Sequence, residues 1–164
     1  MSIDLWIVRT KPLAIEVLLR ETGEALREIL SLPEAPEIVG EQFSCGEISP
    51  IQMELLPIGP RPAIHLRVAR EPEIAQIITI TDATDGPVTF VSMGSQRTAL
   101  EFALGAAVAI ALASDQGSKI EDPGLFFGQP AEQDPSTFKD TVRVRDSFSG
   151  YREAAEQFAQ RLET

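Results

Sequence analysis

The chain has little of the chemistry that marks several common classes of protein. Its 164 residues include one cysteine, Cys45, and one histidine, His65. A single cysteine excludes an internal disulfide framework and fits a reducing compartment. Nothing in the sequence has the spacing of zinc ligands. We therefore expect neither a structural metal nor a cofactor.

Long hydrophobic runs are also missing. No run reaches the roughly 20 apolar residues that a membrane-spanning helix needs. The first residues, MSIDLWIVRTKP, lack the basic start and the long apolar region of a signal peptide. We therefore expect a cytoplasmic protein of bacterial type.

Basic residues are scarce relative to acidic ones. The chain has 14 Lys and Arg against 25 Asp and Glu, a net charge of −11 and a pI near 4.5. This charge repels phosphate backbones and anionic lipid, which argues against nucleic-acid and membrane partners. It would attract a basic protein, although acidity can also serve solubility alone. Arginine greatly outnumbers lysine, and the candidates for bidentate carboxylate contacts are Arg61, Arg67, Arg70, Arg143 and Arg145.

One apolar stretch, residues 95–113, organises the rest of the chain. Ser95 is a candidate N-cap, and Thr98 with Glu101 has the spacing of a capping box. From position 102 to 113 no side chain is charged or strongly polar, and a helix that is apolar on all sides is a buried one. Its many small residues allow close packing. We expect a central buried helix over 95–113 that ends at Asp115-Gln116-Gly117.

Hydrophobic periodicity predicts the other elements. Strand 3–8 is apolar on both faces, which predicts a strand inside a sheet. Pro12 suits the first turn of a helix to about Ser31, which Gly23 could break in two. Further strands are predicted at 38–45, 51–56, 63–70, 74–82, 87–93 and 119–121, with CGEISP as a turn. A short helix starts at Asp134-Pro135, and Ser149 caps a C-terminal helix.

This order of elements predicts a single α+β domain. We expect a mainly antiparallel, meandering sheet with the helices mostly on one face. The alternative is an α/β arrangement in which the unit over residues 88–121 is a parallel crossover.

The start of the central helix is a candidate ligand site. Met93-Gly94-Ser95-Gln96 follows a strand and opens a helix, so its amides could hold an anion. The segment lacks the second glycine of a nucleophile elbow and the lysine of a phosphate loop. Simple capping is the alternative interpretation of Gly94 and Ser95.

Two further groups of residues could carry chemistry. Cys45 and His65 lie on candidate neighbouring strands, and a nucleophile–base pair would need them in contact, with a carboxylate behind the histidine. Otherwise His65 is an outward strand residue and Cys45 a small filler at a turn. The acids at positions 82, 85, 115, 121 and 122 lack the alternation of a calcium loop, so turn chemistry explains them better.

The segment 77–127 resembles a known pattern. It consists of a hairpin, a helix rich in small residues and then GSKIEDPGLFF, and it is similar to small cytoplasmic bacterial proteins of the toxin-immunity type. The resemblance implies a non-enzymatic protein that blocks a partner by binding it. It carries over no catalytic residue.

Acidity, the lack of a catalytic set and this resemblance favour a protein that binds another protein, such as a basic toxin. The alternatives are a small enzyme or ligand-binding domain that uses Gly94 and Ser95, and a structural subunit of a larger assembly. An interface favours aromatic anchors ringed by polar residues. We therefore expect the partner at Glu121, Asp122, Phe126, Phe127, Glu132 and Asp134, with all four acids solvated. The second candidate is the proline-rich segment 41–62, and both phenylalanines could instead be core residues.

Overall fold

The computed structural model describes residues 3–59, 61–71, 78–84, 86–94, 98–148 and 150–163. Over these ranges the chain has the predicted α+β fold, with four helices and a large antiparallel sheet. The predicted features that involve Ser95, Asp85, Ser149 and residues 74–77 lie outside the described ranges.

The main sheet has eight strands in the order β10-β9-β1-β8-β7-β6-β3-β4 over the described ranges. Their bounds are β1 (Ile3–Val8), β3 (Ile38–Ser44), β4 (Glu47–Pro50), β6 (Ala63–Val68), β7 (Ile78–Asp82), β8 (Val88–Met93), β9 (Ile120–Glu121) and β10 (Glu132–Gln133). A second, two-stranded sheet pairs β2 (Leu13–Ala14) with β5 (Leu55–Leu56). The predicted hairpin corresponds to β7 and β8, which pair from Ile78↔Met93 to Asp82↔Thr89.

The alternative α/β arrangement is not what the chain adopts. Every pairing between described strands is antiparallel. β8 and β9 do run in the same direction, because each pairs antiparallel with β1. They are not neighbours, however, since β1 lies between them. Residues 88–121 thus connect two parallel strands, β8 and β9, that are separated in the sheet by β1.

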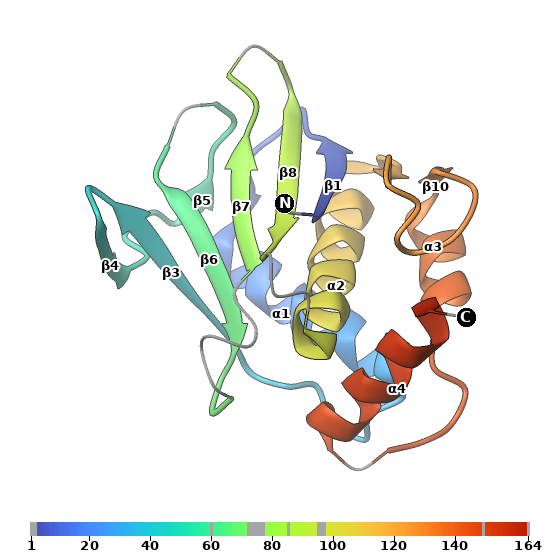
Figure 1. Cartoon of the computed structure of the whole chain (residues 1–164). Coiled ribbons are helices and arrows are strands. Elements are labelled where there is room, and N and C mark those ends of the chain that lie inside the picture. The colour runs from blue at the N-terminus through green and yellow to red at the C-terminus, as the bar shows by residue number, and fades with distance from the viewer. Residues whose placement is uncertain are drawn as a thin grey trace.

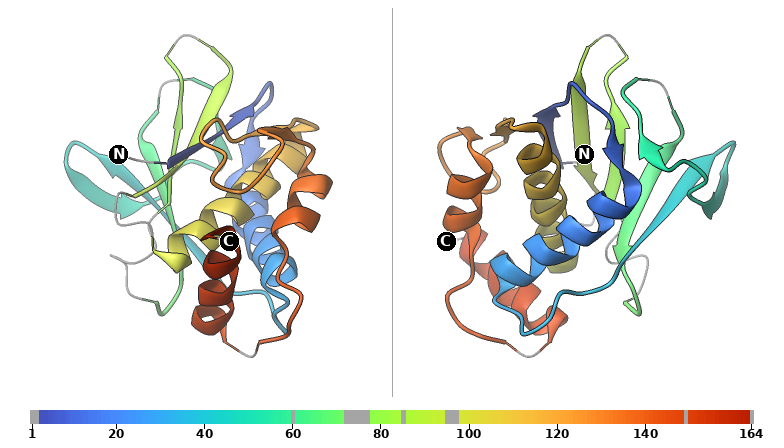
Figure 2. Two further views of the ribbon diagram at one scale, coloured as in Figure 1. Left: turned by 45° about the vertical axis from the view of Figure 1, so that its right-hand side comes forward. Right: turned by 180° about the vertical axis from the view of Figure 1, so that it is seen from behind.

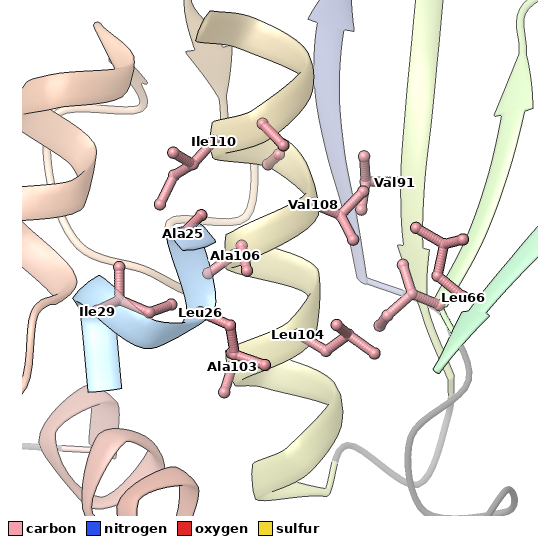
Figure 3. Close-up of a cluster of buried hydrophobic side chains, with 14 of the residues drawn as sticks. Ala25, Leu26, Ile29, Leu66, Val91, Ala103, Leu104, Ala106, Val108 and Ile110 are labelled. Atoms are coloured by element: carbon pink, nitrogen blue, oxygen red, sulfur yellow. The ribbon is translucent and has the colours of Figure 1, made fainter. Parts of the chain in front are cut away.

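The helices gather on one side of the sheet (Figures 1 and 2). They are α1 (Ile15–Leu30), α2 (Ala99–Gln116), α3 (Pro135–Val142) and α4 (Tyr151–Glu163). Figure 3 shows α2 between α1 and the sheet, with Leu104 and Val108 pointing toward Val91 and Leu66. Ala103 and Ala106 point the other way, toward Leu26 and Ala25 on α1.

The central helix is confirmed, although it begins at Ala99 and ends at Gln116. Thr98 Oγ1 accepts from the Glu101 N–H at 3.2 Å, and Glu101 Oε2 accepts from the Thr98 N–H at 3.3 Å, which completes the predicted capping box. Gly117 is left-handed, with φ +63°. Of the described helices, α2 is the one long and apolar enough to cross a membrane, but 72% of it is buried in the molecule, as in a core helix.

The start of α1 differs from the prediction. Pro12 does not begin the helix, because Leu13 and Ala14 pair with Leu56 and Leu55 and the first helical residue is Ile15. Gly23 does not break the helix either. A Cβ there would lie 2.7 Å from the Pro36 carbonyl oxygen, so glycine allows the chain after α1 to pass close to the helix.

Residues 45–56 also differ from the prediction. CGEISP is not simply a turn: Cys45 and Gly46, both with positive φ, join β3 to β4 in a two-residue hairpin. The predicted strand 51–56 shrinks to Leu55–Leu56, and β10 was not predicted. Such short segments take strand geometry from their partners rather than from any pattern of their own.

The C-terminal part agrees with the prediction. α3 begins at Pro135, and Phe138 and Val142 are buried on it. On α4, Ala155 and Phe158 are buried while Tyr151 and Leu162 pack against the core. The Tyr151 hydroxyl donates to the Leu100 carbonyl at 2.9 Å and so ties α4 to α2.

Candidate functional site

The outer face of the sheet, away from the helices, carries exposed apolar side chains. In β1 the inward residues Ile3, Leu5 and Ile7 are at most 1% exposed, whereas Trp6 is 38% and Val8 40% exposed. The prediction that β1 lies inside the sheet is confirmed, since it has a strand on each side. The outer face of β1 is apolar but not buried, because no described helix covers it (Figures 1 and 2).

Trp6 is the centre of a group of side chains near one edge of this face. Phe90 is its direct partner on β8, and the two rings form an edge-to-face contact with centroids 5.9 Å apart. On its other side Trp6 is paired with Glu121, which is paired in turn with Glu132. Directly paired antiparallel residues share a face. We call Trp6, Val8, Phe90, Glu121 and Glu132 the edge patch.

A second exposed apolar group lies near the opposite edge. Phe43 is 40% and Ile48 53% exposed, and they are direct partners on β3 and β4. The Phe43 ring stacks on His65, with centroids 5.6 Å apart. Thr79, Thr81 and Ser92 separate this group from the edge patch, so the outer face has two apolar ends and a polar middle.

The predicted partner site is divided between two environments. Glu121 and Glu132 lie on the edge patch, and Asp134 is exposed nearby. Lys119 lies 3.1 Å from Glu132, and that contact, with help from Asp134, raises the pKa of Lys119. Phe127 is 1% exposed, and its ring lies between those of Phe102, Phe138 and Phe158, so it is a core residue. Phe126 is half-buried against the same core.

Asp122 is not solvated, contrary to the prediction for all four acids. It is 1% exposed, and its Oδ2 accepts from the Phe127 N–H at 2.7 Å. Burial raises the pKa of Asp122, while the backbone N–H groups of residues 124–127 act in the opposite direction. This carboxylate therefore organises the turn that places Phe127 in the core, and it is unsuited to contact a partner.

The described part of the α2 start does not favour an anion. Gly94 precedes the helix, and a Cβ on it would lie 3.1 Å from Glu101 Oε1. The Glu101 carboxylate, 4% exposed, thus already occupies the place where an anion would meet the first amides. Ser95 lies outside the described residues, so the prediction for it stays a prediction.

Cys45 and His65 are not brought together. Their strands are neighbours, as predicted, but His65 is paired with Glu41, and Cys45 lies four positions further along the chain in the exposed turn. At about 3.4 Å per strand residue the separation is more than 10 Å. Burial lowers the pKa of His65, and Glu41 partly offsets this. The pair has no geometry for nucleophilic catalysis.

The described residues contain no group of three His, Cys, Asp or Glu that could hold a metal. They do contain an acidic groove of about 310 Å³ between α1, α2 and α3. Glu21, Glu24, Glu28 and Asp115 line it, and Lys139 binds Glu28 at 2.7 Å across it. The groove has no exposed aromatic anchor.

A buried ionic cluster was missed by sequence reasoning. Arg9 is 0% exposed, and its Nη2 donates to the Leu56 carbonyl at 2.7 Å. Asp82 Oδ1 accepts from Arg61 Nη2 at 3.1 Å and from Thr89 Oγ1 at 2.7 Å, and it lies 3.7 Å from Arg9 Nη1. Burial lowers the pKa of Arg9 and Asp82 raises it, but a guanidinium stays protonated. The signal was available, because Arg9 continues the inward alternation of Ile3, Leu5 and Ile7.

This cluster is structural. It joins the end of β1 to β7 and to the segment after β5, where Asp82 Oδ2 also accepts from the Gly59 N–H at 3.0 Å. Arg61 supports the same segment by donating to the Ile80 carbonyl at 3.1 Å. Of the five predicted arginines, Arg61 and Arg67 pair inside the fold, with Asp82 and Glu41 respectively.

Comparisons with known proteins add no relative: no family model matches the chain, and no curated protein or solved structure is significantly similar to it. The geometry of the outer sheet face therefore carries the functional argument alone.

Proposed function

We propose that this is a non-enzymatic protein that binds another protein through the outer face of its sheet. The observation that carries the proposal is Trp6, which is 38% exposed on an uncovered sheet face beside Val8 and Phe90. An exposed tryptophan in an apolar group ringed by polar residues is typical of an interface centre. Among the described residues no comparable feature supports an enzyme, since Cys45 and His65 are apart and the Glu101 carboxylate occupies the described part of the helix start.

The proposed partner is basic. The net charge of −11 would speed its association and make that association sensitive to salt. The immunity-type resemblance gives one specific form of this hypothesis, in which the protein neutralises a basic toxin in the bacterial cytoplasm. The acidic groove beside α1 would add to this attraction without forming the contact itself.

The test is site-specific photocrosslinking in the cells that produce the protein. A photoreactive phenylalanine analogue replaces Trp6 in one variant and Glu153, exposed on α4, in the control. We expect a discrete adduct from position 6 that is absent from position 153. Equal labelling from both positions, or none from position 6, would remove the outer face as the binding surface.

Catalysis is tested separately from binding. We expect Cys45→Ala to leave the adduct and the biological activity unchanged, since Cys45 lies in the exposed β3–β4 turn. His65→Ala should also retain activity, although it removes a ring that stacks on Phe43. If both variants fold and both lose activity, a catalytic role replaces the binding proposal.

A further inference from the structure

We propose that the edge patch binds an arginine side chain of the partner, with the guanidinium over Trp6 and beside Glu121, and with the Glu132 carboxylate one strand further along the same row. This inference rests on the proposed function, because it specifies what the partner presents to the same face. It assigns a chemical role to residues from four strands that lie far apart in the sequence.

The sheet places an aromatic face and two carboxylates in one row. Trp6 on β1 pairs with Glu121 on β9, which pairs with Glu132 on β10, and all three side chains are on the outer face. Figure 1 labels β1 and β10 at this edge of the sheet, and β9 lies between them. Direct antiparallel partners have Cβ atoms about 5 Å apart, so one planar cation can reach the indole and the nearer carboxylate together.

The carboxylates are not fully neutralised within the chain. Among the described residues, Lys119 pairs with Glu132 at 3.1 Å, and no ion pair engages Glu121. Lys119 and Glu132 are 57% and 53% exposed, so their contact is one that water and competing cations can break. Asp134 adds a further negative charge beside Lys119. The edge patch therefore has an excess of negative charge next to the exposed ring of Trp6.

Arginine fits this combination better than any other side chain. Its planar guanidinium stacks on an indole and at the same time donates bidentate hydrogen bonds in its own plane to a carboxylate. Lysine supplies a point charge without stacking, and an acidic or purely apolar partner leaves the carboxylates unpaired. The Phe90 ring, at 78° to the indole of Trp6, restricts the orientations of the indole and so favours such stacking.

The chain offers a direct probe, because Trp6 is its one tryptophan. The full-length protein is titrated at low salt with the end-blocked peptide Gly-Arg-Gly-Arg-Gly while the indole fluorescence is followed. The same titration uses the lysine and glutamate versions of the peptide. We expect a saturable change with the arginine peptide, a weaker one with the lysine peptide and none with the glutamate peptide.

Two matched double variants separate a local contact from overall charge. Glu121→Gln with Glu132→Gln removes two charges at the edge patch, and Glu153→Gln with Glu156→Gln removes two exposed charges on α4. We expect the first pair of substitutions to weaken binding of the arginine peptide by about two- to tenfold. The second pair should weaken binding of this peptide by much less. All four positions are at least partly exposed, so both variants should fold, which circular dichroism checks.

The outcomes distinguish this inference from the proposed function. Equal weakening by both variants, or equal responses to arginine and lysine peptides, would overturn the arginine site. A crosslinked adduct at position 6 without any response to the arginine peptide would also overturn it, while leaving the outer face as the partner surface. Absence of both signals would end both proposals.

Discussion

At the scale of single residues, the acidic side chains discussed above fall into two sets, one buried in the fold and one on the outer face of the sheet. Asp82 and Asp122 are buried and organise the chain around them, one by pairing with guanidinium groups and the other by accepting from backbone amides. Glu121 and Glu132 project from the outer face, where they are available to a partner. Adjacent positions such as Glu121 and Asp122 thus have different environments, because successive strand residues face opposite sides.

The buried ionic cluster leads to a prediction about stability. Asp82→Ala leaves Arg9 and Arg61 without their carboxylate while both stay buried, which should lower the free energy of unfolding by about 3–5 kcal/mol. Adding Arg9→Met to this variant should restore part of the loss, because it removes an unpaired buried charge. Urea denaturation of the two variants measures both effects. Simply additive losses would show that Arg9 and Asp82 do not interact.

Asp122 should make stability depend on pH with a definite sign. Burial raises the pKa of Asp122 in the native state above its ordinary value of 3.8. At a pH between the ordinary pKa and the raised one, the native state therefore binds more protons than the unfolded state. The contribution of Asp122 to the free energy of unfolding therefore falls as pH rises through that window. Asp122→Asn cannot ionise, so the melting temperature of this variant should rise relative to the wild type from pH 3 to pH 7. A constant or falling difference would contradict the raised pKa.

At the scale of elements, close approach decides how the helices are built. α1 continues through Gly23 because the chain at Pro36 passes where a side chain would otherwise lie. α2 likewise has Gly105 against Met93 of β8, where a Cβ would come within 2.6 Å of the Met93 sulfur. Gly23 and Gly105 therefore reflect contacts with distant segments rather than helix propensity.

Gly23→Ala tests this explanation. Alanine is better than glycine inside a helix by about 1 kcal/mol, so propensity alone predicts a more stable protein. We expect a less stable one, because the new Cβ would lie 2.7 Å from the Pro36 carbonyl oxygen and force the backbone apart. Arg20→Ala, exposed on the same helix, is the control and should change the melting temperature little. A rise in the melting temperature with Gly23→Ala would show that the segment at Pro36 moves away from the helix at little cost in free energy.

At the scale of the whole molecule, α2 holds the layers together. It packs on the sheet with one side and on α1, α3 and α4 with the others, so most of its side chains are buried (Figure 3). The layers cannot form independently around it, and we expect one cooperative unfolding transition for the domain.

Leu104→Asp should prevent folding, since it places an unpaired carboxylate at a position that is 0% exposed between α2 and the sheet. The control is Ser136→Asp, an exposed position in the first turn of α3, which should change stability by no more than about 0.5 kcal/mol. Near-ultraviolet circular dichroism and limited proteolysis report the result. A folded Leu104→Asp protein would mean that the core tolerates water at this layer.

Local patterns were enough to predict most of the elements. The capping box at Thr98 and the apolar run after it predicted α2, and alternating residues predicted β1, β6, β7 and β8. These features depend on residues only a few positions apart in the chain, so the sequence alone predicts them. The two-residue strands β2 and β10 were missed, and β5 was predicted too long, because only their partners make them strands.

The sequence by itself determined the α+β class and the buried central helix, since hydrophobic period and capping chemistry are local properties. The tertiary structure decided everything that depends on register between distant strands. Pairing placed Glu121 and Glu132 beside Trp6 and left Phe127 in the core, although sequence reasoning had grouped those acids with Phe127. It also buried Arg9 with Asp82. Strand register is set by the summed packing of the whole sheet, so no short segment of the chain contains it.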